Sequence, residues 1–187
     1  MMERRRDYSW LDNGQFVKDR IVLQILMANK ELGLCCKARN EVRFNVITMH
    51  SIMDKAAQIN QNLSVLCYAL PRQPPHSFKF LECKIKNSTH SKNMFKIHGV
   101  LFLITKWVKY EELTQRKVFI PIKVPPELQE LLEIYLLSIC PMEIDIVQQL
   151  YGADSALLFH EYLYVEHGQR IYENSFSHTL HSISSVY

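Results

Sequence analysis

The fold is decided where residues 95–104 read FKIHGVLFLI and residues 117–124 read KVFIPIKV. Apolar residues alternate with others along both stretches, a pattern typical of half-buried β-strands. We expect one long or bent strand over the first stretch, with its bend at His98-Gly99. The second is expected to be an edge strand or to contain a bulge, because Pro121 has no N–H to donate to a ladder. The polar residues 110–116 are expected to connect the two.

Outside these strands, apolar residues recur every three or four positions, which indicates amphipathic helices. Pro125-Pro126 is expected to begin a helix that Cys140-Pro141 ends. Two segments leave alternatives open: residues 63–70 suit a helix or a buried strand, and residues 78–86 suit a strand or a short helix. The remaining predicted elements are helices over 17–33, 41–60, 142–150 and from Asn174 or Ser175 onward, and a strand over 162–166 with a turn at His167-Gly168. The predicted fold class is α+β, mostly helical with a small antiparallel sheet.

A proline-rich joint divides the predicted elements into two parts. Residues 71–75 read PRQPP, and prolines at this density cannot continue a helix. We expect a helical N-terminal part over residues 1–71 and an α+β part over residues 72–187. The last predicted helix reaches Tyr187 without a closing signal, so the chain is expected to be truncated at its C-terminus.

Composition excludes several classes of protein. The chain has 187 residues, of which 48% are hydrophobic and 22% charged, enough for a packed core and too apolar for wholesale disorder. It has only 5 Gly and no glycine-rich phosphate-binding loop. Its longest apolar run, residues 100–104, is far below the roughly 20 residues that cross a bilayer. The start of the chain lacks the apolar stretch of a signal peptide, so we expect an intracellular protein without a membrane partner.

The five cysteines predict neither a disulfide framework nor a zinc site. Their number is odd and no C-x-x-C spacing occurs. We expect each to be a reduced, buried thiol, and we expect no metal and no cofactor. The cysteines are Cys35, Cys36, Cys67, Cys83 and Cys140.

Charge is strongly segregated along the chain. Residues 72–123 contain 11 basic and 3 acidic residues, a net charge of +8, whereas residues 124–187 contain 1 basic and 9 acidic residues, a net charge of −8. A basic block of this kind suits contacts with a phosphate backbone, because each neutralised phosphate releases counterions. The acidic last third would be repelled by nucleic acid and should face elsewhere.

From residue 72 onward, a series of short motifs resembles a known family. Residues 72–81 read RQPPHSFKFL, residues 92–95 read KNMF, residues 103–109 read LITKWVK and residues 164–168 read YVEHG. In this order and spacing they resemble the tyrosine-recombinase-like region of fungal proteins that also carry RecQ-type, telomere-linked helicase domains. The resemblance implies a fold like part of a tyrosine recombinase catalytic domain, a nuclear location, and an attached or neighbouring helicase domain.

The catalytic residues of that family are only partly matched. Recombinases attack a DNA phosphodiester with a tyrosine, while two arginines and a His/Lys set stabilise the developing charge. His76 stands where the first arginine belongs, and Arg72, four residues upstream, is the alternative. Lys109 aligns with the lysine that acts as general acid, and no His-x-x-Arg motif precedes Tyr187. The resemblance therefore implies a degenerate copy that is not an enzyme as it stands.

Three functions compete at this point. In the first, the chain is a DNA-binding module whose basic block meets the backbone without sequence specificity. In the second it is the front fragment of a larger helicase-linked enzyme, and in the third a structural or interaction remnant that does not bind DNA. Phe102, Trp107 and Tyr110, beside Lys106 and Lys109, could stack on the bases or sugars of a single strand, although strand alternation would place about half of these aromatic residues in the core. The lysines predicted to contact DNA are Lys84, Lys86, Lys92, Lys106 and Lys109.

Overall fold

The computed structural model describes residues 35–38, 41–70, 77–86, 92–107 and 118–185. Its order of elements is β1 (Cys35–Ala38), β2 (Glu41–Phe44), α2 (Val46–Ala69), α3 (Ser77–Leu81), β3 (Met94–Ile97), β4 (Val100–Trp107), β5 (Val118–Lys123), α5 (Pro126–Ile134), the π-helical turn η3 (Tyr135–Ile139), α6 (Cys140–Tyr151), α7 (Ala153–Glu161), β6 (Val165–Glu166), β7 (Gln169–Arg170) and α8 (Glu173–Ser184). The predicted α+β class is confirmed, with helices predominating and every strand pair antiparallel.

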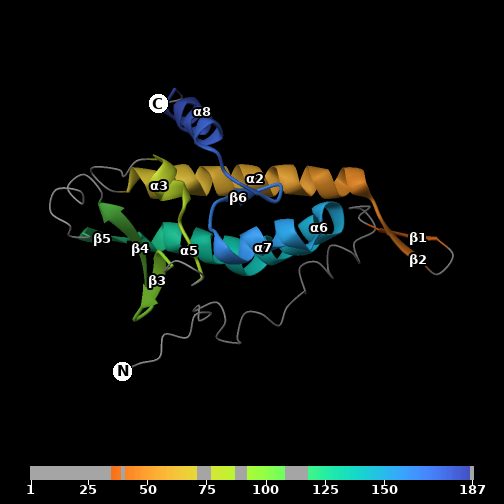
Figure 1. The fold of residues 1–187 in the computed structure, drawn as a ribbon, viewed down its shortest axis with the longest axis horizontal. Helices are drawn as coiled ribbons and strands as arrows, with labels where there is room; N and C mark the ends of the chain where they lie inside the picture. The colour runs from red at the N-terminus through yellow and green to blue at the C-terminus, as the bar shows by residue number, and fades with distance from the viewer. Residues whose placement is uncertain (1–34, 39–40, 71–76, 87–91, 108–117, 186–187) are drawn as a thin grey trace.

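The elements are arranged around the long helix α2 (Figure 1). The α5–η3–α6 helix runs alongside it, and α8 lies on the opposite side of α2. The three-stranded sheet lies at one end of the molecule, and the β1–β2 ribbon projects from the other end. Within the described residues, no helix combines the length and the apolar character that a membrane crossing needs.

The helix α2 begins at a side-chain cap. The Oδ1 atom of Asn45 accepts hydrogen bonds from the backbone N–H groups of Ile47 and Thr48, at 3.1 and 3.3 Å. The predicted helix over 41–60 was wrong at its start, because residues 41–44 pair with β1, and the 63–70 segment proves to be helix. Buried positions recur every three or four residues along α2, as in Met49, Met53, Ala56, Asn60, Leu63 and Cys67.

One helical rod replaces the two helices predicted on either side of Cys140-Pro141. Pro141 lacks an N–H and its ring would collide with the carbonyl of Leu137 in a regular α-helix. The rod accommodates it with the π turn η3, in which the N–H of Cys140 donates to the carbonyl of Tyr135 five residues back. The proline therefore changes the pitch of the helix instead of ending it.

The stretch 95–104 forms a hairpin, so the prediction of one long or bent strand was wrong. His98 and Gly99 both have positive φ, 49° and 80°, which suits the two-residue turn of a right-twisted hairpin. The sheet order is β3-β4-β5, so the prediction of an edge strand containing Pro121 is confirmed. The predicted connection over 110–116 and the predicted helix over 17–33 lie outside the described residues.

Residues 77–81 adopt the short-helix alternative. Phe80 and Leu81 are adjacent and both buried, which a half-exposed strand with alternating faces does not allow. Phe80 joins an aromatic cluster in which ring centroids lie 4.9 to 6.2 Å apart. Its other members are Tyr68, Tyr164 and Phe176.

The C-terminal region contains one helix, α7, that the sequence patterns did not predict. The predicted turn at His167-Gly168 is confirmed, although the strand before it is only two residues long. The last helix begins at Glu173, slightly before the predicted cap. The side chain of Asn60 ties α2 to this region, since its Nδ2 donates to the carbonyls of Leu163 and Val165 at 3.1 and 2.9 Å.

A single hydrophobic core joins α2 to elements from residue 80 onward. Met49, Met53 and Cys67 of α2 are buried in the same cluster as Leu132 and Phe176. Helix α2, which belongs to the predicted N-terminal part, therefore packs as a layer of the α+β part, whereas the β1–β2 ribbon projects away from it.

Candidate nucleic-acid interface

The three-stranded sheet separates an inner face from an outer one. Met94 and Leu103 are register partners on neighbouring strands, and both are buried against the core. Side chains alternate across a strand, so Phe95 and Phe102, which are also register partners, lie on the opposite, outer face. Both residues are half-buried.

The outer face is unusually apolar for a surface. Ile97 is 51% exposed at the hairpin end, and Phe119 on β5 is 59% exposed at the other end. Ile104 and Pro121 are register partners that lie between the ends. Exposed apolar groups gathered on one face typically mark an interaction surface.

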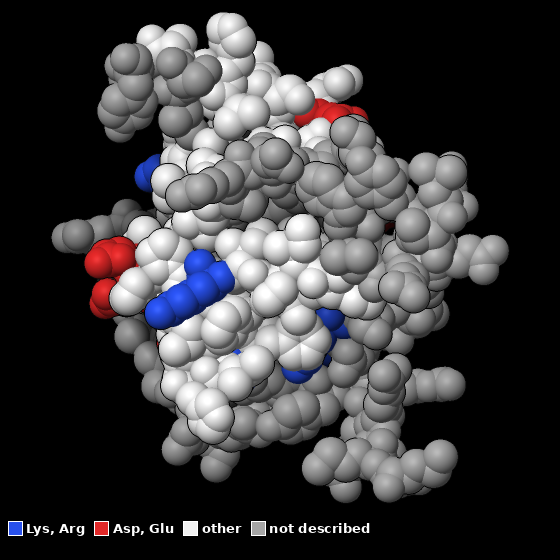
Figure 2. Space-filling view, turned by 90° about the vertical axis from the view of Figure 1, so that its left-hand side faces the viewer, with Lys and Arg blue, Asp and Glu red and all other residues white. Residues whose placement is uncertain are grey.

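Lysines border this aromatic face. Lys92 precedes β3 and places its Nζ 5.2 Å from the centroid of the Phe95 ring. Lys123 is the register partner of Phe102 on β5 and is exposed. The sequence contains no Asp or Glu over residues 92–107 or 118–124. Figure 2 looks at this end of the molecule and shows lysine or arginine side chains within a mainly uncharged surface, with acidic groups towards its borders. We call Phe95, Phe102, Phe119, Lys92 and Lys123 the sheet face.

Polar contacts hold the β3 end of the sheet in place. The side chain of Asn93 donates to the carbonyl of Ile104 at 3.1 Å and accepts from the N–H of Lys84 at 3.1 Å. Because Asn93 sits between Lys92 and the first residue of β3, these bonds fix the start of the strand. They thereby also fix the backbone positions of Lys92 and Phe95, which lie on either side of this point.

The inner side of the hairpin is fastened to α5. Gln129 accepts a hydrogen bond from the N–H of Leu101 at 2.9 Å and donates to the carbonyl of Gly99 at 2.8 Å. The Nζ of Lys96 lies 2.9 Å from a carboxylate oxygen of Glu133. The charge of Lys96 is thus paired within the fold, on the side of the sheet away from Phe95 and Phe102.

The lysines predicted from the sequence are placed unequally. Lys84 is buried, with its Nζ 3.2 Å from Glu161 and 4.7 Å from the centroid of the Tyr162 ring, so it serves the fold and we leave it out of the sheet face. Lys86 is half-buried after α3, outside the sheet. Lys92 belongs to the sheet face. Lys106 lies in β4 opposite Phe119 in register, but its side chain is outside what the structure describes.

The family-motif positions His76 and Lys109, with the alternative Arg72, lie outside the described residues. Sequence reasoning did not single out Phe95, Phe119 or Lys123 as candidates for the site. The signal that could have found them was strand alternation itself, which assigns Phe95, Phe102, Phe119 and Lys123 to one face once the hairpin at His98-Gly99 is recognised.

A shallow groove of about 500 Å³ adjoins the sheet face where the hairpin meets α5. Val100 and Val124 line its sheet side, and Ile134 lines its helix side together with the carboxylates of Glu130 and Glu133. Lys123 of the sheet face lines the groove as well, and Glu133 is paired with Lys96, so Glu130 supplies the negative charge that would repel a phosphate backbone there. The groove therefore marks a border of the face and not a continuation of it.

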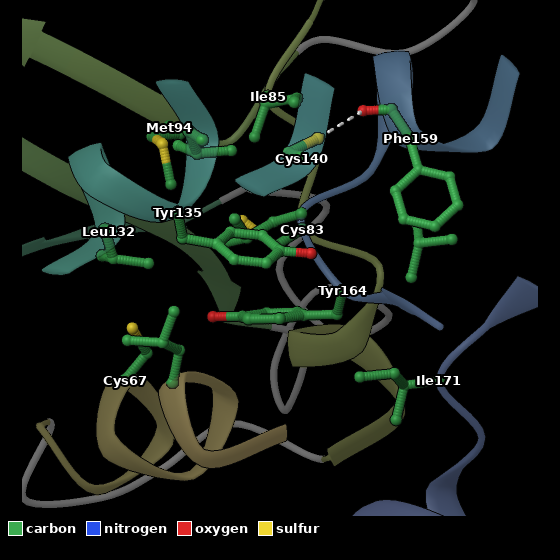
Figure 3. Close-up of a cluster of buried hydrophobic side chains, with 14 of the residues drawn as sticks. Cys67, Cys83, Ile85, Met94, Leu132, Tyr135, Cys140, Phe159, Tyr164 and Ile171 are labelled. Carbon is green, nitrogen blue, oxygen red and sulfur yellow. Dashed lines mark hydrogen bonds between the residues drawn. The ribbon is translucent and has the colours of Figure 1, made fainter. Parts of the chain in front are cut away.

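The core contains a cluster of reactive types of side chain, thiols and phenols. Figure 3 shows Tyr135 and Tyr164 between Cys67, Cys83 and Cys140. Burial raises the pKa of the Cys67 thiol to about 12 and raises the pKa of Cys83 and Cys140 further. A thiol attacks as the thiolate, so these groups are inert core residues, and the predicted free, buried state is confirmed for all three.

Next to this cluster lies a carboxyl group with no exposure to water. Glu143 is 0% exposed, and its Oε2 accepts a hydrogen bond of 2.8 Å from the hydroxyl of Tyr135. Burial raises the pKa of Glu143 to about 8, although the Tyr135 hydrogen bond works against this rise. The core encloses the Glu143–Tyr135 pair, so no substrate can reach it. Ionisation of Glu143 therefore affects only the stability of the fold.

In comparisons with protein-family models, curated proteins and solved structures, nothing matches this chain significantly. Among the described residues, no group of three or more His, Cys, Asp or Glu side chains is placed to hold a metal ion. The sheet face is therefore the candidate site.

Proposed function

We propose that this chain is a non-catalytic DNA-binding module of low sequence specificity, with the sheet face as its contact surface. The observation that supports this most directly is the placement of Lys92 and Lys123 beside Phe95 and Phe102, on a sheet whose strands contain no acidic residue. Lysine ammonium groups pair with phosphate oxygens, and such contacts position a nucleic acid without reading its sequence.

The charge pattern favours the sheet end over the helices as the contact surface. Residues 72–123, which contain the sheet, carry a net charge of +8, and residues 124–187, which contain α5 to α8, carry −8. An acidic surface repels the backbone, so DNA would approach from the sheet end and leave the acidic helices facing solvent or a neighbouring protein. On the resemblance alone we also propose that the module is a recombinase-like remnant that accompanies a helicase domain in the nucleus.

The test is the affinity for labelled DNA as a function of salt, measured by fluorescence anisotropy on the whole chain. For duplex DNA the logarithm of the binding constant should fall linearly with the logarithm of salt concentration, by about 0.9 per neutralised phosphate. Lys123→Gln should weaken binding about two- to fivefold, as expected for one exposed ion pair, and should reduce the slope by about one.

Lys55→Gln is the matched control. Lys55 is an exposed lysine of α2, so the substitution makes the same change in net charge outside the sheet face. The proposal is wrong if the two variants weaken binding equally, or if the wild-type chain binds neither single-stranded nor duplex DNA at low salt. An interaction remnant would give the latter result.

A further inference from the structure

We propose that the sheet face prefers a single strand of nucleic acid to a duplex and holds its bases by stacking on Phe95, Phe102 and Phe119. This inference rests on the proposed function and goes beyond it, because lysines alone would accept either form. The rings are the distinguishing feature. In a duplex the bases stack on one another and offer their faces to nothing else, whereas an unpaired base can lie flat on an aromatic side chain.

The positions of the rings suit successive bases of one strand. Phe95 and Phe102 face each other across neighbouring strands, a separation of about 5 Å between backbones. Phe119 is the register partner of Lys106, which lies four residues along β4 from Phe102. The backbone positions of Phe119 and Phe102 are therefore about 13 Å apart along the strand direction. Phe119, which is 59% exposed, is the most accessible of the three rings, whereas Phe95 and Phe102 are half-buried and the Nζ of Lys92 lies over the Phe95 ring.

The lysines lie where a single-stranded nucleic acid would place its phosphates if its bases stacked on those rings. Lys123 lies in the same cross-strand row as Phe95 and Phe102, and Lys92 approaches the Phe95 ring from the start of β3. Two rings thus lie side by side, with a lysine beyond each of them. A purely apolar protein partner would bring no anion to these lysines, and a second copy that met this face with the same face would bring like charges together.

The experiment compares an oligothymidylate of about 16 nucleotides, the upper end of site sizes for one stacking domain, with a duplex of the same length and with oligouridylate. We expect either single strand to bind more tightly than the duplex. Phe119→Leu should lower single-strand affinity about fivefold to hundredfold, as loss of one stacking platform does, and should leave duplex affinity unchanged. Phe119→Tyr keeps the ring and should bind like the wild type.

Tyr172→Leu is the matched control, because Tyr172 is 65% exposed and belongs to the connection between β7 and α8, outside the three-stranded sheet. Thermal unfolding of each variant shows that the fold is intact. Equal affinity for single strand and duplex overturns the inference, as does an unchanged affinity of Phe119→Leu for oligothymidylate, while salt-dependent binding that weakens in Lys123→Gln would leave the proposed function standing. A Phe119→Leu variant that changes only the sedimentation of the free protein would show a second copy on this face and would also overturn the inference.

Discussion

At the scale of single residues, Glu143 is the group whose ionisation the fold opposes. Its carboxyl lies in the core, where one oxygen accepts a hydrogen bond from Tyr135 and the other has no hydrogen-bond partner among the residues that the structure describes. The pKa of about 8 in the folded chain compares with an ordinary value near 4.5, so the folded state keeps a proton that the unfolded state has lost between these pH values. The free energy of unfolding therefore falls as pH rises across that range, by up to about 1.4 kcal/mol per pH unit from this group.

Glu143→Gln should remove this dependence. Glutamine is uncharged at every pH, and its amide oxygen can still accept the hydrogen bond from Tyr135. We expect the variant to be more stable than the wild type above the pKa of about 8 and to lose the advantage near pH 5, as measured by urea unfolding. Glu130→Gln, an exposed position of α5, is the control. An unchanged pH dependence in Glu143→Gln would show that the carboxyl is hydrated in the folded state.

At the scale of elements, the two short hairpin turns differ in what surrounds them. Gly99 and Gly168 both have positive φ, 80° and 74°, where side chains other than hydrogen are strained. A Cβ at Gly99 would meet nothing within 4 Å, whereas a Cβ at Gly168 would lie 2.9 Å from the Cβ of Ser155 and 3.3 Å from a methyl group of Val147. The β6–β7 turn is therefore packed tightly against the helices α6 and α7.

Gly99→Ala and Gly168→Ala consequently form a matched pair. Both substitutions introduce backbone strain that lowers the free energy of unfolding by about 1 kcal/mol. Gly168→Ala must also displace α7, so its total loss of stability should be about 2–4 kcal/mol. Urea unfolding of the two variants measures the difference. Equal losses of stability would mean that α7 shifts without cost.

The elements also show how far sequence patterns reach. The cap at Asn45 and the hairpin turn at His98-Gly99 have local causes but were missed, since the predicted helix began at residue 41 and residues 95–104 were predicted as one strand. Pro121 and Gly168 also act locally, and the edge strand and the His167-Gly168 turn could be predicted from them. The 41–44 strand and the passage of a helix through Pro141 could not, because the first depends on pairing with β1 and the second on a π turn that a periodic pattern does not signal. The candidate lysines were predicted from charge, and charge does not reveal burial. Only the fold shows that Lys84 is buried and Lys123 is exposed.

At the scale of the whole molecule, one core implies one unfolding transition. The predicted division at residue 71 would allow the two parts to unfold separately, but α2 contributes Met49, Met53 and Cys67 to the same cluster as residues from α5 to α8. We expect the loss of helical circular dichroism and the change in tyrosine fluorescence to coincide during urea unfolding. Two separated transitions would instead support independent parts.

The length of α2 has a consequence of its own. The helix contains 24 residues, so its axis is about 36 Å long, and it stands between the β1–β2 ribbon at one end and the three-stranded sheet at the other. A straight helix packed along its length resists compression, so it keeps the ribbon and the sheet at a fixed separation. A nucleic-acid strand bound to the sheet as we propose would therefore lie about that far from the β1–β2 ribbon.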